Sequence, residues 1–143
     1  MSISSRGSIK YLDRYKQLIS YEGMVRHRGI TPTDIDGFID YSGNVFLYLE
    51  CKLLSKELDI GQRKALENVV KSHDASDKKG CAAIFKHNSK PDEIIMAKDQ
   101  YVSEIYLLGG DNYSWIQVFN EKITLLDFIE RFENWCIKQG YKI

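Results

Sequence analysis

Apolar and polar residues alternate with a period of two along two neighbouring runs, residues 31–41 and 45–52. Between them lies Ser42-Gly43-Asn44, and a glycine flanked by Ser and Asn between apolar-rich runs is typical of a hairpin turn. Successive side chains of a strand point to opposite faces. Each run therefore has one charged and aromatic face: Asp34, Asp36, Phe38 and Asp40 in the first, and Phe46, Tyr48, Glu50 and Lys52 in the second. The pattern predicts a β-hairpin around which the rest of the chain is organised.

Elsewhere, apolar residues recur at helical spacing in three places. The first is residues 8–21, with Ser8 as N-cap and Gly23 at the end, followed by a strand-like basic segment at 24–30. The second is a stripe over residues 60–72. The third begins after Thr124, with Asp127 completing an approximate capping box and Gly140 as the C-terminal cap. We expect three helices.

Short apolar runs bounded by turn residues predict further strands. They are residues 81–85, 93–97, 100–108 and 113–119, and Gly109 opens a turn between the last two. Tyr101, Tyr106, Tyr113 and Trp115 make this region aromatic. Such side chains can stack on bases, but aromatic residues are ordinary on half-buried sheets, so the pattern favours packing. Strands and helices in this order predict an α/β protein.

The composition is that of a globular protein, with 43% apolar and 28% charged residues in 143 positions, and we expect a single domain over residues 1–143. The net charge of zero disfavours a strong, indiscriminate binder of duplex DNA, but it leaves room for local basic clusters. Three widely spaced cysteines form no zinc motif and suggest free thiols in a reducing compartment. No apolar run approaches the roughly 20 residues that span a bilayer, so we expect a cytoplasmic protein without membrane partners.

The hairpin register decides whether charged groups meet. If Tyr41 faces Val45, Asp36 falls opposite Glu50 and Asp34 opposite Lys52, with opposed Cβ atoms roughly 5 Å apart. Two carboxylates at that distance suit a hard cation such as Mg²⁺, which keeps waters for a phosphate to displace. A neighbouring lysine can stabilise charge on a phosphoryl group. A one-residue slip would send these groups to opposite faces.

Asp36 followed by Glu50-Cys51-Lys52 resembles the D…(D/E)-x-K signature of the PD-(D/E)xK nucleases, the restriction-endonuclease-like superfamily. Gly61-Gln62, at the start of the second helix, resembles several branches that place a Gln there. The run from Ile30 to Gly37, Ile-Thr-Pro-Thr-Asp-Ile-Asp-Gly, is similar to small phage-type members. The resemblance covers roughly residues 15 to 87.

The resemblance implies a restriction-endonuclease-like αβββαβ core, a mixed sheet flanked by helices, here with extra C-terminal strands and a terminal helix. It implies that Asp36, Glu50 and the Cys51 carbonyl hold Mg²⁺ or Mn²⁺ and that Lys52 orients the nucleophile. Gln62 would position substrate. Asp34 remains a rival to Asp36 as the main ligand.

The family's first helix often presents a Glu to the site. Glu22 is the match in this chain, as a catalytic residue and a ligand of a second cation. A solvated Glu near a helix end is the competing interpretation.

The predicted function is therefore a metal-dependent nuclease that hydrolyses phosphodiester bonds, with DNA favoured by the resemblance over RNA. Because many relatives work as dimers, a homodimer is compatible with it, as is a phage-encoded protein acting in the host cytoplasm. Two alternatives stay open. One is an inactive nuclease-fold module that binds nucleic acid or protein, for example a phage-type inhibitor. The other is a purely structural salt-bridge cluster of Asp36, Glu50 and Lys52.

Overall fold

The computed structural model describes residues 17–109 and 111–143. The chain divides into two compact units, Met1–Pro32 and Thr33–Ile143, each of which is described by itself. The expectation of a single domain stays a prediction.

In the first unit, the expected helix over residues 8–21 is wrong where it can be compared. Residues 8–16 lie outside the described part, and residues 17–21 are not helical. A turn follows at Glu22–Gly23, where Gly23 adopts a φ of 82° and the Met24 N–H donates to the Tyr21 carbonyl. The segment expected to be strand-like contains instead the short 3₁₀ turn η1 (His27–Gly29), with Arg28 and Gly29 both at positive φ.

The second unit is built on a five-stranded mixed sheet in the order β1-β2-β3-β4-β5. The strands are β1 (Gly37–Tyr41), β2 (Val45–Leu53), β3 (Lys79–His87), β4 (Tyr101–Gly109) and β5 (Asn112–Gln117). Strands β2 and β3 are parallel, and the other neighbours are antiparallel. The α/β class is confirmed.

The hairpin has the predicted register, with Tyr41 opposite Val45 and Gly37 opposite Leu49. Its turn is held by local hydrogen bonds, since the Gly43 N–H donates to the Asp40 carboxylate (2.6 Å) and the Asn44 N–H to the Tyr41 carbonyl (3.0 Å). The first strand is shorter than predicted. Pairing begins at Gly37, so Asp34 and Asp36 lie just before the strand.

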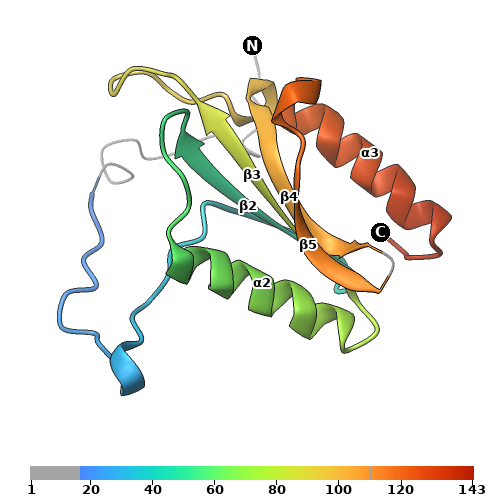
Figure 1. The fold of residues 1–143 in the computed structure, drawn as a ribbon, viewed down its shortest axis with the longest axis horizontal. Helices are drawn as coiled ribbons and strands as arrows, with labels where there is room; N and C mark the ends of the chain where they lie inside the picture. The colour runs from blue at the N-terminus through green and yellow to red at the C-terminus, as the bar shows by residue number, and fades with distance from the viewer. Residues whose placement is uncertain (1–16, 110) are drawn as a thin grey trace, which may run out of the picture. The chain divides into compact units, whose positions relative to one another are not determined.

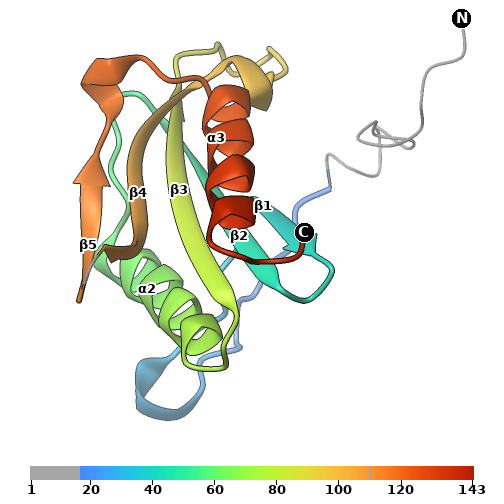
Figure 2. The same ribbon diagram turned by 90° about the vertical axis from the view of Figure 1, so that its right-hand side faces the viewer.

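Helices cover both faces of the sheet, α2 (Ile60–Asp74) on one and α3 (Leu125–Lys138) on the other (Figure 1, Figure 2). Both begin at side-chain caps, because Asp59 accepts from the Gln62 N–H and Thr124 from the Asp127 N–H. Successive side chains of β2 point to opposite faces of the sheet. Tyr48 therefore packs on the α2 side, whereas Leu47 belongs to the core under α3. Neither helix is long and apolar enough to cross a bilayer.

The predicted strand over residues 93–97 is wrong. Residues 91–93 form a turn and bend, and the short 3₁₀ helix η2 (Ala97–Asp99) follows. The apolar run of residues 93–97 is only four residues long, and Ile94 is 77% exposed because no sheet face receives it. The strand predicted over 113–119 ends at Gln117, and Phe119 begins the 3₁₀ turn η3 (Phe119–Glu121).

Gly80 is the point of closest approach between β3 and α2. A Cβ there would lie 2.8 Å from the Val70 Cα and 2.9 Å from its carbonyl oxygen, both backbone atoms.

We expect Gly80→Ala to lower the free energy of unfolding by about 1–3 kcal/mol, because helix and strand must separate. Gly61→Ala is the matched control. Its Cβ would approach only the Asp59 carboxylate, at 3.4 Å, and helix propensity favours Ala. Urea unfolding of both variants measures the difference, and equal stability would contradict the packing argument.

Candidate functional site

Glu50 is a buried carboxyl group in the middle of the sheet. It lies on β2, on the face covered by α2, and is 4% exposed. Burial and the nearby Asp36 carboxylate raise its pKa to about 7 from an ordinary value of 4.5, and Lys52 only partly offsets the effect. An acid with this pKa changes protonation state near neutral pH, which is typical of functional sites.

Asp36 reaches Glu50 from the segment before β1. Its Oδ2 accepts a hydrogen bond from the Cys51 backbone N–H at 2.8 Å, across the same pair of strands. This bond fixes an exposed carboxylate close to a buried one. A strand residue directs its N–H and C=O toward the same neighbouring strand. The Cys51 carbonyl therefore faces the side on which Asp36 lies.

Lys52 stands two residues after Glu50 on the same sheet face, and its Nζ lies 3.9 Å from Glu50 Oε1. The lysine side chain is 24% exposed, whereas the Glu50 side chain is 5% exposed. The cation thus sits at the rim, between the buried carboxyl group and solvent.

Gln62 comes from the first turn of α2. Its Nε2 donates to Glu50 Oε1 at 3.4 Å, a long hydrogen bond. Its Oε1 is buried and has no hydrogen-bond partner among the described residues. A buried acceptor without a hydrogen-bond partner costs free energy, so this atom is placed to accept a hydrogen bond from a donor such as a bound water.

Glu50 and Gln62 line a cavity of about 190 Å³ between the sheet and α2. Asp34 borders the same cavity, but no hydrogen bond within the described part of the chain fixes its carboxylate. The remaining walls are mostly apolar: Thr33, Ile35, Ala65, Leu66 and Val69. These walls explain why the charged form of Glu50 is disfavoured.

The structure therefore brings together Asp36, Glu50, the Cys51 backbone, Lys52 and Gln62. Glu22 lies in the first unit, in an exposed turn. Its place in the site stays a prediction.

Within residues 17–109 and 111–143, no three side chains of His, Cys, Asp or Glu gather as a metal-binding group. The donor set is thus a carboxylate pair with backbone and amide oxygens beside it. Those are hard oxygen ligands of the kind that Mg²⁺ uses together with several waters.

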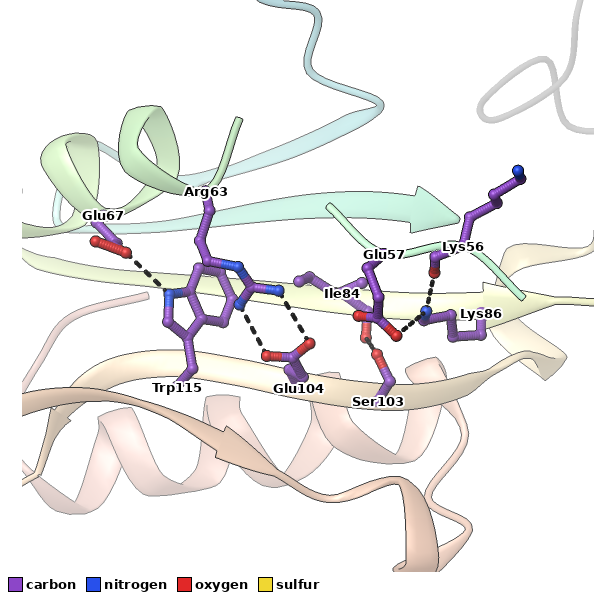
Figure 3. Close-up of polar contacts among 9 residues, drawn as sticks. All are labelled: Lys56, Glu57, Arg63, Glu67, Ile84, Lys86, Ser103, Glu104 and Trp115. Carbon is purple, nitrogen blue, oxygen red and sulfur yellow. Dashed lines mark hydrogen bonds and ion pairs between the residues drawn. The ribbon is translucent and has the colours of Figure 1, made fainter. Parts of the chain in front are cut away.

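The sequence analysis did not predict two charged contacts on the α2 side of the sheet, which Figure 3 draws. Arg63 forms two hydrogen bonds to the buried Glu104 of β4, at 2.8 and 3.2 Å, and its guanidinium lies 4.6 Å from the centre of the Trp115 ring. Buried Lys86 of β3 donates to the Lys56 carbonyl and pairs with Glu57 at 3.1 Å. The available signal was a charge inside or directly after an apolar strand run, as at positions 86 and 104.

No model of a known protein family matches the chain, and neither does any curated protein or solved structure.

Proposed function

We propose that this protein is a metal-dependent nuclease that hydrolyses phosphodiester bonds, most readily in DNA. The observation that carries the proposal is a buried Glu50 held beside Asp36, with Lys52 at 3.9 Å and a buried amide oxygen on Gln62 to which no residue in the described part of the chain donates. Desolvating a carboxylate costs free energy that an apolar residue would avoid. Its burial next to a second carboxylate is therefore better explained by a bound cation than by packing.

The residues fit Mg²⁺ or Mn²⁺. Asp36, Glu50 and the Cys51 carbonyl would hold the ion, and Gln62 Oε1 is placed to accept a hydrogen bond from a water in that cavity. A bound divalent ion would lower the pKa of a water and polarise the scissile phosphate.

The chain's own side chains account for the remaining roles. Lys52, at the rim, can orient the attacking water or offset charge developing on the phosphate. Gln62 couples Glu50 to the first turn of α2, so movement of that turn would move the carboxyl group. Glu22 would assist a second ion.

The topology supports the same proposal. An antiparallel hairpin, the covering helix α2 and the parallel strand β3 follow one another, as in the second half of an αβββαβ core. Strands β4 and β5 and helix α3 would be the C-terminal elaboration. Residues 17–36 contain neither the helix nor the strand that such a core places first.

Cleavage of end-labelled DNA tests the function directly. The wild-type protein should cut in Mg²⁺ or Mn²⁺ and lose activity in EDTA, with labelled RNA of the same sequence as the parallel substrate. Binding of the labelled DNA without any cleavage, at all metal concentrations, would instead support the inactive-module alternative.

Metal titration distinguishes Asp36 from Asp34. We expect Asp36→Asn to weaken Mn²⁺ binding in isothermal titration by at least the roughly 10- to 100-fold that loss of an outer-shell partner costs, because a charged ligand itself is lost. Asp34→Asn is the matched control and should change the affinity much less, because the Asp36 carboxylate is the one anchored at Cys51. The reverse order would transfer the ligand role to Asp34.

A further inference from the structure

A second and larger cleft, of about 440 Å³, lies at the carboxyl ends of the parallel strands β2 and β3. Residues directly after β2, at the end of β3 and at the start of β4 line it, together with the η3 turn. Figure 1 and Figure 2 both place these segments at the end of the sheet to which β3 points. Its volume is within the range of small-molecule sites, and ligands of open α/β sheets bind at the carboxyl ends of the strands.

The cleft presents two aromatic rings on a fixed backbone. Tyr101 is 43% exposed and Phe119 is 40% exposed. The backbone around Tyr101 is held on both sides, by β3 and by a bridge to Thr124. Phe119 is held by the η3 turn, in which the Lys122 N–H donates to its carbonyl. Exposed rings on rigid supports lose little entropy when a flat ligand stacks on them.

The polar lining matches a phosphate-bearing base. Lys122 is exposed, and among the described residues that line the cleft none is acidic. His87 Nδ1 accepts from the Ser89 N–H, which leaves Nε2–H as the donor of the neutral ring. The amide side chains of Asn88, Gln100 and Asn120 add donors and acceptors that can pair with a base edge.

The cleft adjoins the candidate metal site. Lys86 lines the cleft and is the register partner of Lys52 on the neighbouring parallel strand. Adjacent strands are about 4.8 Å apart. A polymer whose scissile phosphate sits at Lys52 would therefore have its next nucleotides within reach of Tyr101 and Phe119.

We propose that this cleft binds an unpaired nucleotide flanking the scissile phosphate, with its base against both Tyr101 and Phe119 and its phosphate at Lys122 and His87. The proposal rests on the nuclease function, which it deepens by specifying a substrate with a single-stranded segment beside the cut. A stacked base is a sequence-tolerant anchor, which suits a chain with no net charge.

The test is binding without metal or cleavage. Fluorescence anisotropy of a fluorescein-labelled thymidine hexanucleotide in EDTA, at low salt, should give saturable binding. An abasic hexamer of equal charge should bind several-fold more weakly, because it lacks the rings that stack. Tyr101→Ala and Phe119→Ala should each lower the affinity for the hexanucleotide by roughly 5- to 100-fold. Tyr101→Phe should bind it like the wild type.

The cation is tested by Lys122→Asn. Asn is chosen because Lys122 has a φ of 52°, a conformation that Asn tolerates. This variant should lower the affinity for both hexamers. Lys138→Ala should lower neither affinity, because exposed Lys138 lies at the end of α3, some 20 Å along the helix from Thr124.

The outcomes separate this proposal from the nuclease function. If the cleft variants lose binding while the wild type never cleaves, the cleft stands and the nuclease proposal fails. If the wild type cleaves but Tyr101→Ala and Lys122→Asn bind normally, or the abasic hexamer binds equally well, the cleft proposal is overturned. An absence of binding by the wild type also overturns it.

Discussion

Glu50→Gln should abolish DNA cleavage and, in the same molecule, stabilise the metal-free fold above pH 7. Gln keeps the size and the hydrogen-bonding capacity of Glu but removes the charge that would hold a cation. We expect cleavage to fall on the order of 10²–10³-fold or more, as when one electrostatic contribution to a transition state is lost. A residue whose charge served only the fold would show loss of stability instead.

The sign of the stability change follows from the raised pKa. Glu50 titrates at about 7 in the folded protein and at its ordinary 4.5 when unfolded, so the folded state binds more protons between these values. The stabilisation that this difference provides is complete below pH 4.5 and is lost as the pH rises through 7. At pH 8 the wild type therefore carries a buried charge that Gln lacks, and Glu50→Gln should be more stable by about 1–3 kcal/mol.

Urea unfolding at pH 5 and pH 8, with and without Mn²⁺, measures this effect. The gain should appear at pH 8 in EDTA and shrink at pH 5. Saturating Mn²⁺ should stabilise the wild type but not the variant, because only the wild type holds the ion. Glu130→Gln, an exposed position on α3, is the matched control and should leave cleavage and stability unchanged. A Glu50→Gln protein that still cut at the wild-type rate would remove Glu50 from the catalytic assignment.

The elements that the sequence predicts correctly are those whose signals are local. The Ser42-Gly43-Asn44 turn sets the hairpin register through bonds within four residues, and so it fixes the relative positions of Asp36 and Glu50. The N-cap at Thr124 likewise marks the start of α3. Gln62 is placed near Glu50 by the family resemblance, and in the structure the Asp59 cap sets the helix start that brings its side chain there.

The errors fall where a local pattern lacks a tertiary partner. Residues 93–97 read as a strand, but their apolar side chains find no sheet face, and a strand without a neighbour leaves its backbone groups unpaired. The Arg63–Glu104 pair was missed for the opposite reason. The two residues are 41 positions apart, and only the order β3-β4 brings Glu104 under α2.

The Arg63–Glu104 ion pair leads to a second prediction with a large effect. Arg63→Met should destabilise the fold by about 3–5 kcal/mol, because the Glu104 carboxylate is left buried and unpaired. The Glu104 side chain is 5% exposed and receives both guanidinium hydrogen bonds. Removing Arg63 also removes its stacking on Trp115, whose Nε1 donates to Glu67. Two attachments of α2 to the sheet depend on this one side chain.

A double variant separates the charge from the packing. Arg63→Met combined with Glu104→Leu should recover most of the stability, because well-packed apolar groups can replace a buried ion pair. The exposed pair Lys98–Asp99 is the control, with both side chains about 60% exposed, and Lys98→Met should change the free energy of unfolding by less than about 1 kcal/mol.

The recovered double variant also tests function, because Gln62 stays next to position 63 in the first turn of α2. If it folds stably and cleaves normally, the ion pair serves the fold alone. If it folds stably but binds Mn²⁺ more weakly, Arg63 also positions Gln62 against Glu50. A single Arg63→Met variant as stable as the wild type would contradict the assigned burial of Glu104.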